Sequence, residues 1–367
     1  MMLEAPFFCS MMPSSQIQVR VWVPILLKLV TLNKGLPFGK ARKSKSFFCF
    51  FLSFRSLIRT FAAEMTYQEM NRRLRAAIAD EREAQAVGRM IIETAFGLSW
   101  ADALCGGLKA LSAADAERLE TVVSRIEQGE PVQYAIGFAP FCGRLFEVTP
   151  AVLIPRPETE GLVAPLPSPI PSPILDIGTG SGCIAITLAL IYPGARVDAI
   201  DISEDALRVA RRNAERLGAN VNFWLMDILS EASLPFPQGG EGATLPCSCA
   251  CPMEASPLGG DGRGAFSLIV SNPPYIAEKE RWTMEAHVLE HEPHQALFVP
   301  DSDPLLFYRV IAEKGLSWLK PGGLLLFEIN PIYARELEEL LAQMGYERIA
   351  IRQDQFGKNR YLHAHRP

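Results

Sequence analysis

The feature that most constrains the fold is an alternation of short apolar strands with helices that starts at Ile174. The strand-like runs ILDI, RVDAIDI and VNFWLMDI are separated by two helical patterns, the second covering 203–217 and closed by Gly218. FSLIV, a helix around 304–318, GLLLFEI, a helix near 333–343, RIAIRQD and NRYLHAHR follow. This alternation predicts right-handed crossovers in a mostly parallel sheet. Because no helix separates the last two strands, we expect an antiparallel hairpin there.

Residues 65–130 predict a small helical domain ahead of the sheet. Apolar residues recur at helical spacing from Met70 to Phe96, and Ser112 is suited to cap a further helix that Gly129 would stop. Such a domain either serves packing alone or docks a partner.

The segment 131–155 joins the helical domain to the sheet. It mixes β-branched and aromatic residues with Gly137, Pro140 and Gly143, so we predict a β-hairpin connector. The rest of the chain, 156–367, is assigned to the sheet domain. This part includes the Pro-rich spacer PLPSPIPSP and a Gly-, Pro- and Ser-rich insertion at 231–264, which lacks periodicity and is predicted to be disordered.

The first 64 residues differ in charge from the rest. Nine of the 36 basic residues, but only Glu4 and Glu64 of the 41 acidic ones, fall in 1–64. This stretch is typical of a targeting presequence, a membrane-associating segment or upstream sequence translated from an early start codon, and we predict that it is disordered or absent from the mature protein. Its apolar run VWVPILLKLVTL is too short to span a bilayer.

The remaining residues, 65–367, hold 27 basic and 39 acidic side chains, a net charge of −12. Such an acidic body is a poor partner for nucleic acid, because binding to phosphates depends on Lys and Arg. The eight cysteines show no disulfide-framework spacing, and the C-x-C-x-C run at 247–251 lacks zinc-knuckle gaps. HVLEH at 287–291 matches an inverted zinc-protease pattern, but no third ligand is evident nearby. We therefore predict no bound metal.

The turn DIGTGSG, between a buried strand and a helix, is a candidate cofactor loop. Missing side chains let a ligand approach the backbone, although a dinucleotide enzyme or a tight packing turn could carry such a loop. The next strand ends at Asp201, where a carboxylate either caps a helix or accepts both ribose hydroxyls of an adenosine ligand. A third strand ends in Asp227, placed to meet the adenine. The candidate cofactor residues are Asp176, Gly178, Thr179, Gly180, Ser181, Gly182, Asp201, Asp227, Ile228 and Asn272.

These features, together with KPGG before the fifth strand, resemble the class I S-adenosylmethionine-dependent methyltransferases. The resemblance implies an α/β fold with a Rossmann-like seven-stranded sheet, and S-adenosyl-L-methionine as cofactor. In that fold the end of the fourth strand faces the cofactor sulfonium, and SNPPY lies there. NPPY at this position is similar to enzymes that methylate planar nitrogens, namely adenine N6, cytosine N4 or a glutamine amide.

The candidate catalytic residues are those of this turn, Asn272, Pro273, Pro274 and Tyr275. An amide nitrogen is a poor nucleophile, so the site must align it with the S-methyl bond and accept its hydrogens. The side-chain carbonyl of Asn272 and the backbone carbonyl of Pro273 can take the two N–H groups. The prolines fix φ, and Tyr275 can pack on the flat amide. A proline-terminated edge strand would explain the prolines alone.

GEPVQY, VLIPRPETE, DIGTGSG, NPPYI and FYRVI together resemble the peptide chain release factor glutamine methyltransferases. The resemblance implies N5-methylation of the glutamine in the GGQ loop of class I release factors, and a helical first domain that grips the release factor. It also implies a substrate-binding role for Arg156 and Glu158. The insertion at 231–264 and Ile228, where an aromatic residue is usual, depart from the family pattern.

Three other functions stay open. A glutamine methyltransferase acting on a ribosomal protein would carry an RSP-type sequence in place of RPETE. A DNA adenine-N6 methyltransferase would need a basic groove and a target-recognition domain. A non-enzymatic cofactor-binding module would not need NPPY. We expect a monomer that acts on protein, without nucleic acid or membrane, in the cytoplasm, or in a mitochondrion or plastid if 1–64 is a transit peptide.

Overall fold

The computed structural model describes residues 65–163, 172–231 and 266–367, all within one compact unit, Met65–Pro367. The N-terminal extension, most of the Pro-rich spacer and all but the first residue of the insertion at 231–264 lie outside the described residues. What the sequence predicts of them stays a prediction.

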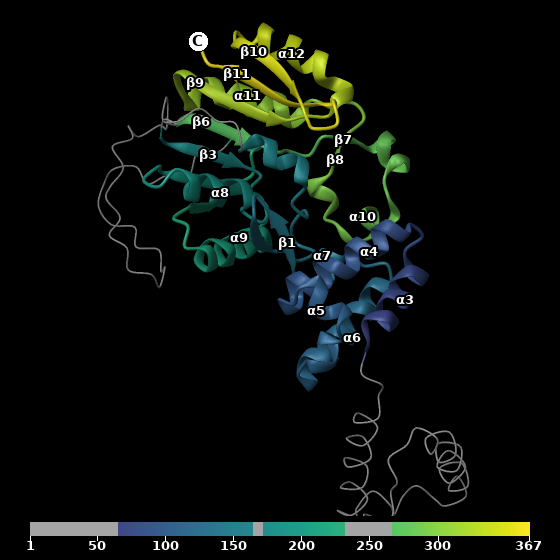
Figure 1. The fold of residues 1–367 in the computed structure, drawn as a ribbon. Coiled ribbons are helices and arrows are strands. Elements are labelled where there is room, and N and C mark those ends of the chain that lie inside the picture. Colours follow the sequence, from purple (N-terminus) through teal and green to yellow (C-terminus); the bar gives the residue numbers. More distant parts are fainter. Residues whose placement is uncertain (1–64, 164–171, 232–265) are drawn as a thin grey trace, which may run out of the picture. The chain divides into compact units, whose positions relative to one another are not determined.

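Seven strands form one sheet in the order β10-β11-β9-β6-β3-β4-β5 (Figure 1). Neighbours from β9 to β5 are parallel, whereas β11 is antiparallel to both β9 and β10. The predicted mostly parallel sheet and its C-terminal antiparallel hairpin are therefore confirmed. The strands are β3 (Ile174–Ile177), β4 (Val197–Asp201), β5 (Asn222–Leu225), β6 (Phe266–Ser271), β9 (Leu319–Glu328), β10 (Glu347–Gln353) and β11 (Asn359–His365).

Helices cover both faces of this sheet. Every residue of β3 and β6 is buried, as expected for central parallel strands. Side chains of α11 (Leu306–Trp318) and α12 (Ala334–Gln343) share one apolar cluster with Leu175 and Ile269. Side chains of α8 (Cys183–Ile191) and α9 (Glu204–Leu217) share the other cluster with Ile174 and Leu268, which precede Leu175 and Ile269 in the sequence. Period-2 alternation thus divides the core into two layers.

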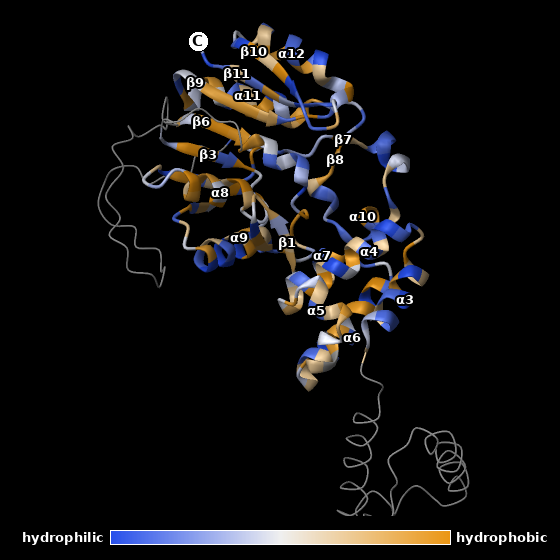
Figure 2. Cartoon of the chain, in the orientation of Figure 1, coloured by the Kyte–Doolittle hydropathy of each residue, from blue (hydrophilic) through white to orange (hydrophobic). Residues whose placement is uncertain are grey.

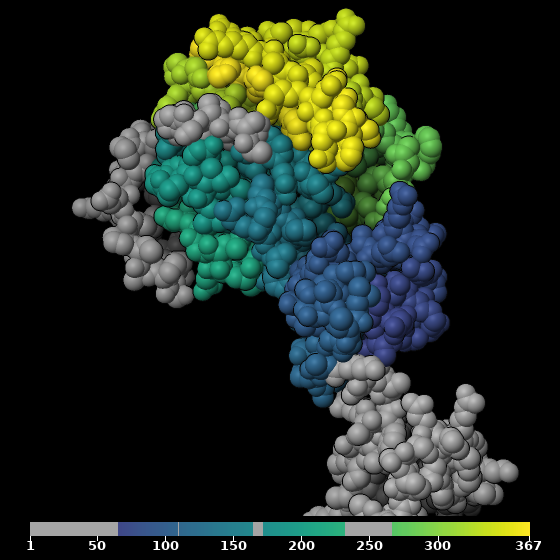
Figure 3. Space-filling view, in the orientation of Figure 1, coloured from purple at the N-terminus to yellow at the C-terminus, as the bar shows by residue number. Residues whose placement is uncertain are grey.

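The two helices on the second face differ in character, as their sequences dictate. Helix α8 is apolar almost throughout, whereas α9 is mostly hydrophilic with a narrow apolar stripe (Figure 2). The predicted limits of α9 are confirmed. The Ser203 side chain accepts the Ala206 N–H at its start, and Gly218 ends it in the left-handed region at φ 70°. At the β10 edge of the sheet, α12 and the C-terminal hairpin, both in yellow, lie together (Figure 3).

Helices also make up residues 67–127, as predicted, with an apolar core of their own. Ser112 caps the last of them, accepting from the Asp115 N–H at 3.1 Å, and Gly129 follows its end at φ 91°. The elements are α3 (Tyr67–Ala77), α4 (Glu81–Met90), the π-helical turn η4 (Ile91–Ala95), α5 (Trp100–Leu104), η5 (Gly107–Ala110) and α6 (Ala113–Glu127).

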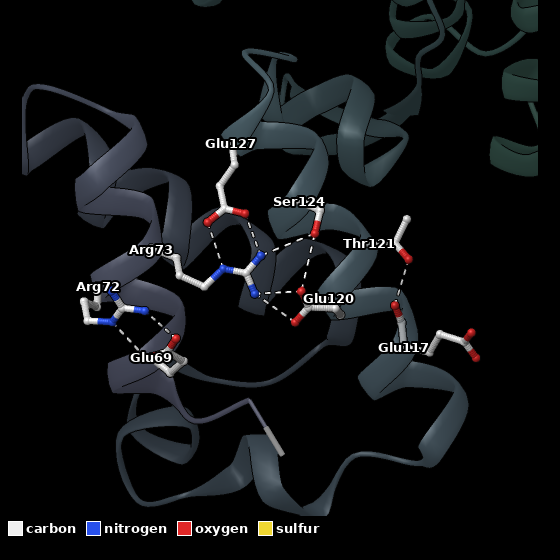
Figure 4. Close-up of polar contacts among 8 residues, drawn as sticks. All are labelled: Glu69, Arg72, Arg73, Glu117, Glu120, Thr121, Ser124 and Glu127. Carbon is white, nitrogen blue, oxygen red and sulfur yellow. Dashed lines mark hydrogen bonds and ion pairs between the residues drawn. The ribbon is translucent and has the colours of Figure 1, made fainter. Parts of the chain in front are cut away.

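A single arginine ties the first of these helices to the last (Figure 4). The Arg73 guanidinium of α3 makes a two-pronged contact with Glu127 of α6, at 2.8 and 2.6 Å. It also donates to both carboxylate oxygens of Glu120, at 2.7 and 2.8 Å, and to the Ser124 hydroxyl at 3.3 Å. All five guanidinium N–H groups are thereby used. The arginine side chain is 17% exposed, so it works partly shielded from water.

The connector differs in part from the prediction of a strand pair. Residues Val132–Ile136 form a short helix, α7, and the hairpin starts only at Phe138, with β1 (Phe138–Phe141) and β2 (Arg144–Glu147). Most side chains of α7 are buried, and the Tyr134 hydroxyl donates to the Val152 carbonyl at 2.6 Å. Tertiary packing therefore outweighs the strand propensity of these residues.

Short elements complete the sheet domain. They are η6 (Pro157–Leu162), β7 (Ile276–Ala277), η7 (Glu278–Thr283), α10 (Ala286–His291), η8 (His294–Ala296), β8 (Phe298–Val299) and η9 (Pro331–Tyr333), with β7 and β8 paired in parallel.

No helix in the described ranges is long and apolar enough to cross a membrane.

Candidate active site

The strand order reverses between β3 and β6, because the chain runs from β3 outward to β4 and β5 and then returns to β6 and β9. Ligands of open α/β sheets bind at such a point, outside the carboxyl ends of the strands. Ile177 pairs with Ser271, and Ser271 with Phe327. The Ser271 hydroxyl also donates to the Ile177 carbonyl at 2.7 Å. The glycine loop, the NPPY turn and Glu328 therefore start side by side.

The three glycines of the loop have a left-handed backbone. Gly178, Gly180 and Gly182 have φ of 73°, 55° and 81°. A Cβ built on either of the first two would meet nothing within 4 Å, and Gly178 is exposed, so the space over this turn is open. A Cβ on Gly182 would lie 2.8 Å from the Ile186 Cδ1 and 3.1 Å from the Ala210 Cβ. The third glycine thus serves helix packing.

Asp176 anchors the loop from below. Its Oδ2 accepts from the Thr179 hydroxyl at 2.6 Å and from the Ala185 N–H at 3.2 Å, while its buried Oδ1 has no partner among the described residues. Burial raises the pKa of Asp176 to about 7, although these hydrogen bonds oppose the shift. Ser181 is buried beside it, and its backbone carbonyl accepts from Asn213 at 3.0 Å.

Asp201 stands at the end of β4, facing the loop. Its two oxygens accept from the Gly180 N–H at 2.8 Å and the Ser203 N–H at 2.9 Å. Each oxygen keeps a further lone pair, so the carboxylate fits a vicinal diol such as a ribose. Burial raises the pKa of this carboxyl group, with the backbone hydrogen bonds opposing. The open loop and this acceptor together fit an adenosine-containing ligand.

Asp227 and Ile228, which the sequence suggests as contacts of the adenine, are engaged mainly in local and core contacts. Asp227 Oδ1 accepts from the Leu229 N–H at 2.8 Å, which forms a local turn. Ile228 is 8% exposed and packs in the core, whereas Ile202 and Leu229 are 56% and 42% exposed. These two apolar side chains, not considered in the sequence analysis, are further candidates to face an adenine ring. Ile202 directly follows Asp201 and Leu229 lies two residues after Asp227, and these positions were the available signal.

A cavity of about 290 Å³ lies against the NPPY turn. Asn272, Pro273 and Tyr275 line it, as does Arg156, but Pro274 and Glu158 do not. The remaining lining residues are Leu153, Ile276, Thr283, Met284, Glu285, Val288, Ala296, Leu297 and Glu328. The cavity is therefore mostly apolar with a few polar groups, the usual composition of a small-molecule binding site.

A buried carboxylate that sequence reasoning missed also lines this cavity. Glu328, the last residue of β9, is 2% exposed. Its two oxygens accept from the Tyr275 hydroxyl at 3.0 Å and the Thr159 hydroxyl at 2.7 Å, and Asn272 Nδ2 donates to the Thr159 oxygen at 3.3 Å. Burial raises the pKa of Glu328 against the effect of these two bonds. A glutamate that ends an apolar strand at the carboxyl edge was the available signal.

The arginine in the cavity wall is held by a second buried acid. Arg156 Nη2 lies 2.5 Å from Glu292 Oε1, and the Glu292 side chain is fully buried. The backbone carbonyl of Glu158 accepts from the Tyr361 hydroxyl at 2.5 Å. Glu160 accepts from the Cys142 N–H at 2.7 Å, in the turn of the connector hairpin. Of this charged run, Arg156 alone borders the cavity.

The described residues hold no group of three or more His, Cys, Asp or Glu side chains that could bind a metal ion. His287 and His291 lie on α10, as the HVLEH pattern implies, and His287 pairs with Glu285 at 3.3 Å. The cysteines at 247–251 lie outside the described residues.

Comparisons with known proteins agree with the description of the sheet domain and with that of the helical domain. Residues 174–247 match the family described as a methyltransferase domain, and residues 66–137 match the PrmC N-terminal domain. The release factor glutamine methyltransferase of Bacteroides thetaiotaomicron is 43% identical over 77% of this chain and 93% of its own length. That of Flavobacterium psychrophilum is 36% identical over 78% and 93%, and that of Chlorobaculum tepidum 41% over 67% and 76%. The chain belongs to the release factor glutamine methyltransferase family.

Proposed function

We propose that this protein methylates the side-chain amide nitrogen, N5, of the glutamine in the GGQ motif of class I peptide chain release factors, with S-adenosyl-L-methionine as methyl donor. The observation that carries the proposal is the cavity lined by Asn272, Pro273 and Tyr275. The NPPY turn follows β6, and the open glycine loop follows β3, the strand that pairs with β6. A donor on the loop and an amide in the cavity would therefore meet at the same edge of the sheet.

The donor half of the site is supported by the chemistry of its groups. When bound, S-adenosyl-L-methionine supplies an electrophilic methyl group on a sulfonium. Asp201 would accept the ribose hydroxyls, and the open backbone at Gly178 and Gly180 would admit the ligand without side-chain obstruction. Ile202 and Leu229 would flank the adenine with apolar surface.

The acceptor half must orient a weak nucleophile. Asn272 Oδ1 and the Pro273 carbonyl would each accept one N–H of the glutamine amide, which turns the nitrogen toward the methyl group. Tyr275 would pack on the amide plane. Transfer of the methyl group would form the N–C bond and break the S–C bond, leaving a neutral thioether. The methylated nitrogen would then be acidic and would release its proton to water, so no free carboxylate base is needed.

The helical domain, in this proposal, holds the release factor, while the acidic net charge of 65–367 argues against direct contact with nucleic acid. We propose further that the enzyme acts as a monomer in the cytoplasm, where release factors work. A DNA adenine-N6 methyltransferase remains the contrasting function, because NPPY also suits an aromatic amine.

The test uses the full chain, methyl-labelled S-adenosyl-L-methionine and a cognate release factor. Label is expected on the GGQ glutamine, located by peptide mass spectrometry. A release factor in which alanine replaces this glutamine is the control and should take up no label. Label on DNA but not on the release factor would refute the proposal.

A further inference from the structure

The hydrogen bonds around Glu328 have a direction that matters to the acceptor site. In its ionised form, which the bonds from Thr159 and Tyr275 favour, Glu328 has no hydrogen to donate, so both hydroxyls that reach it are the donors. The only hydrogen of the Thr159 hydroxyl is then spent on Glu328, at 2.7 Å. Toward every other neighbour, the Thr159 oxygen can only accept.

This direction settles which way the neighbouring amide faces. Asn272 has a donor end and an acceptor end that are nearly identical in shape, so packing alone does not distinguish them. Against an oxygen that only accepts, Nδ2 forms a hydrogen bond at 3.3 Å, whereas a flipped amide would set two acceptors against each other. Oδ1 is thereby left as the end that can accept from a substrate.

We propose that Glu328 and Thr159 are positioning residues that fix the side-chain amide of Asn272 with its oxygen toward the substrate nitrogen. This inference rests on the proposed function, since it assumes that a planar N–H donor enters the cavity. Thr159 and Glu328 are 3% and 2% exposed, so water does not compete for their hydrogen bonds. Neither has to touch the substrate. Without them, Asn272 would present the wrong end in part of the molecules.

The main test replaces the threonine by an isosteric residue. Thr159→Val should lower kcat by about tenfold, or about 1.4 kcal/mol, while KM for the release factor and affinity for S-adenosyl-L-methionine stay within twofold. Thr159→Ser, which keeps the hydroxyl, should restore most of the rate. The matched control is Thr187→Val, because Thr187 is fully buried and its hydroxyl has no hydrogen-bond partner among the described residues. A Thr159→Val enzyme as fast as wild type would overturn the proposal.

A double variant shows whether the threonine acts through the asparagine. Asn272→Ala combined with Thr159→Val should be no slower than Asn272→Ala alone, since no amide remains to be oriented. If the two losses multiply instead, Thr159 acts by another route. Glu328→Gln keeps one acceptor oxygen and should fall between wild type and Thr159→Val in kcat.

A spectroscopic readout keeps the inference testable even if the proposed function fails. In the full chain labelled with ¹⁵N-asparagine, the Asn272 amide pair is identified by its loss in Asn272→Ala. Its proton shifts should move in Thr159→Val and stay unchanged in Thr187→Val. Unchanged shifts in both variants would overturn the inference that Thr159 and Glu328 fix the orientation of the Asn272 amide. Absence of methyl transfer by the wild-type enzyme would instead refute the proposed function. The shifts would still show whether Thr159 and Glu328 orient the Asn272 amide.

Discussion

Two glycines of one loop are expected to fail in different ways when each is replaced by alanine. Gly178 and Gly182 both have left-handed φ, of 73° and 81°, and a residue with a Cβ pays about 1–2 kcal/mol for that backbone. At Gly178 an added Cβ meets nothing within 4 Å. At Gly182 it would also lie 3.1 Å from the Ala210 Cβ and 2.8 Å from Ile186, and such overpacking costs about 1–3 kcal/mol more.

Gly182→Ala should therefore lose about 2–5 kcal/mol of stability and Gly178→Ala about 1–2 kcal/mol. Thermal unfolding followed by circular dichroism measures the difference, since each kcal/mol lowers Tm by about 2–4 °C in a domain of this size class. Calorimetric titration with S-adenosyl-L-methionine then separates the roles. Gly178→Ala should bind the donor much more weakly although it is the more stable variant, because its methyl group enters the ligand space.

Equal losses of stability in the two variants would refute the reasoning that close helix packing distinguishes these glycines. Wild-type affinity for the donor in Gly178→Ala would show that the open space above the first glycine is not the ligand space. The wild-type protein in the same buffer is the reference for both measurements.

Three further predictions concern other parts of the molecule. Asn272→Ala should lose turnover while affinity for S-adenosyl-L-methionine stays the same; equal loss of both in kinetic and calorimetric measurements would contradict the division of the site. Arg73→Met should destabilise the protein by about 1–3 kcal/mol, through loss of charge-assisted bonds to Glu127 and its neighbours, with Arg72→Met, an exposed residue, as the control in thermal unfolding. Asp176 has a folded pKa of about 7, above its unfolded value, so the folded state holds a proton that the unfolded state has lost between these values. Stability should therefore fall as pH rises toward 7, by up to about 4 kcal/mol, and urea unfolding of Asp176→Asn should show a flatter pH profile; an identical slope would contradict it.

Local patterns accounted for much of the fold. The seven strands follow from short apolar runs that alternate with helical patterns, and the limits of α9 follow from a serine at its start and a closing glycine. Helix α7 was not foreseen, because its side chains are held by contacts with residues distant in sequence, such as the 2.6 Å bond from Tyr134 to Val152. A propensity scale contains no such contacts.

The candidate site was likewise foreseen where a motif carries it. DIGTGSG and NPPY lie in continuous sequence; the first forms the glycine loop, and the residues of the second except Pro274 line the cavity. Glu328 and Thr159 are 169 residues apart, and Glu292 lies 136 residues from Arg156. Pairings of this kind depend on which strand ends are neighbours, and that order emerges only when the sheet is assembled.

The bond from the Ser271 hydroxyl to the Ile177 carbonyl has a consequence for how the enzyme would fail. It fixes the register in which the methyl donor loop and the acceptor turn leave neighbouring strands. A slip of one residue would shift the acceptor by about 3.3 Å and turn its side chains to the opposite face. A shifted register of these strands would therefore not support methyl transfer, and activity depends on the native register of the sheet. Destabilised variants should lose active molecules in proportion to unfolding, while each folded molecule keeps its full turnover.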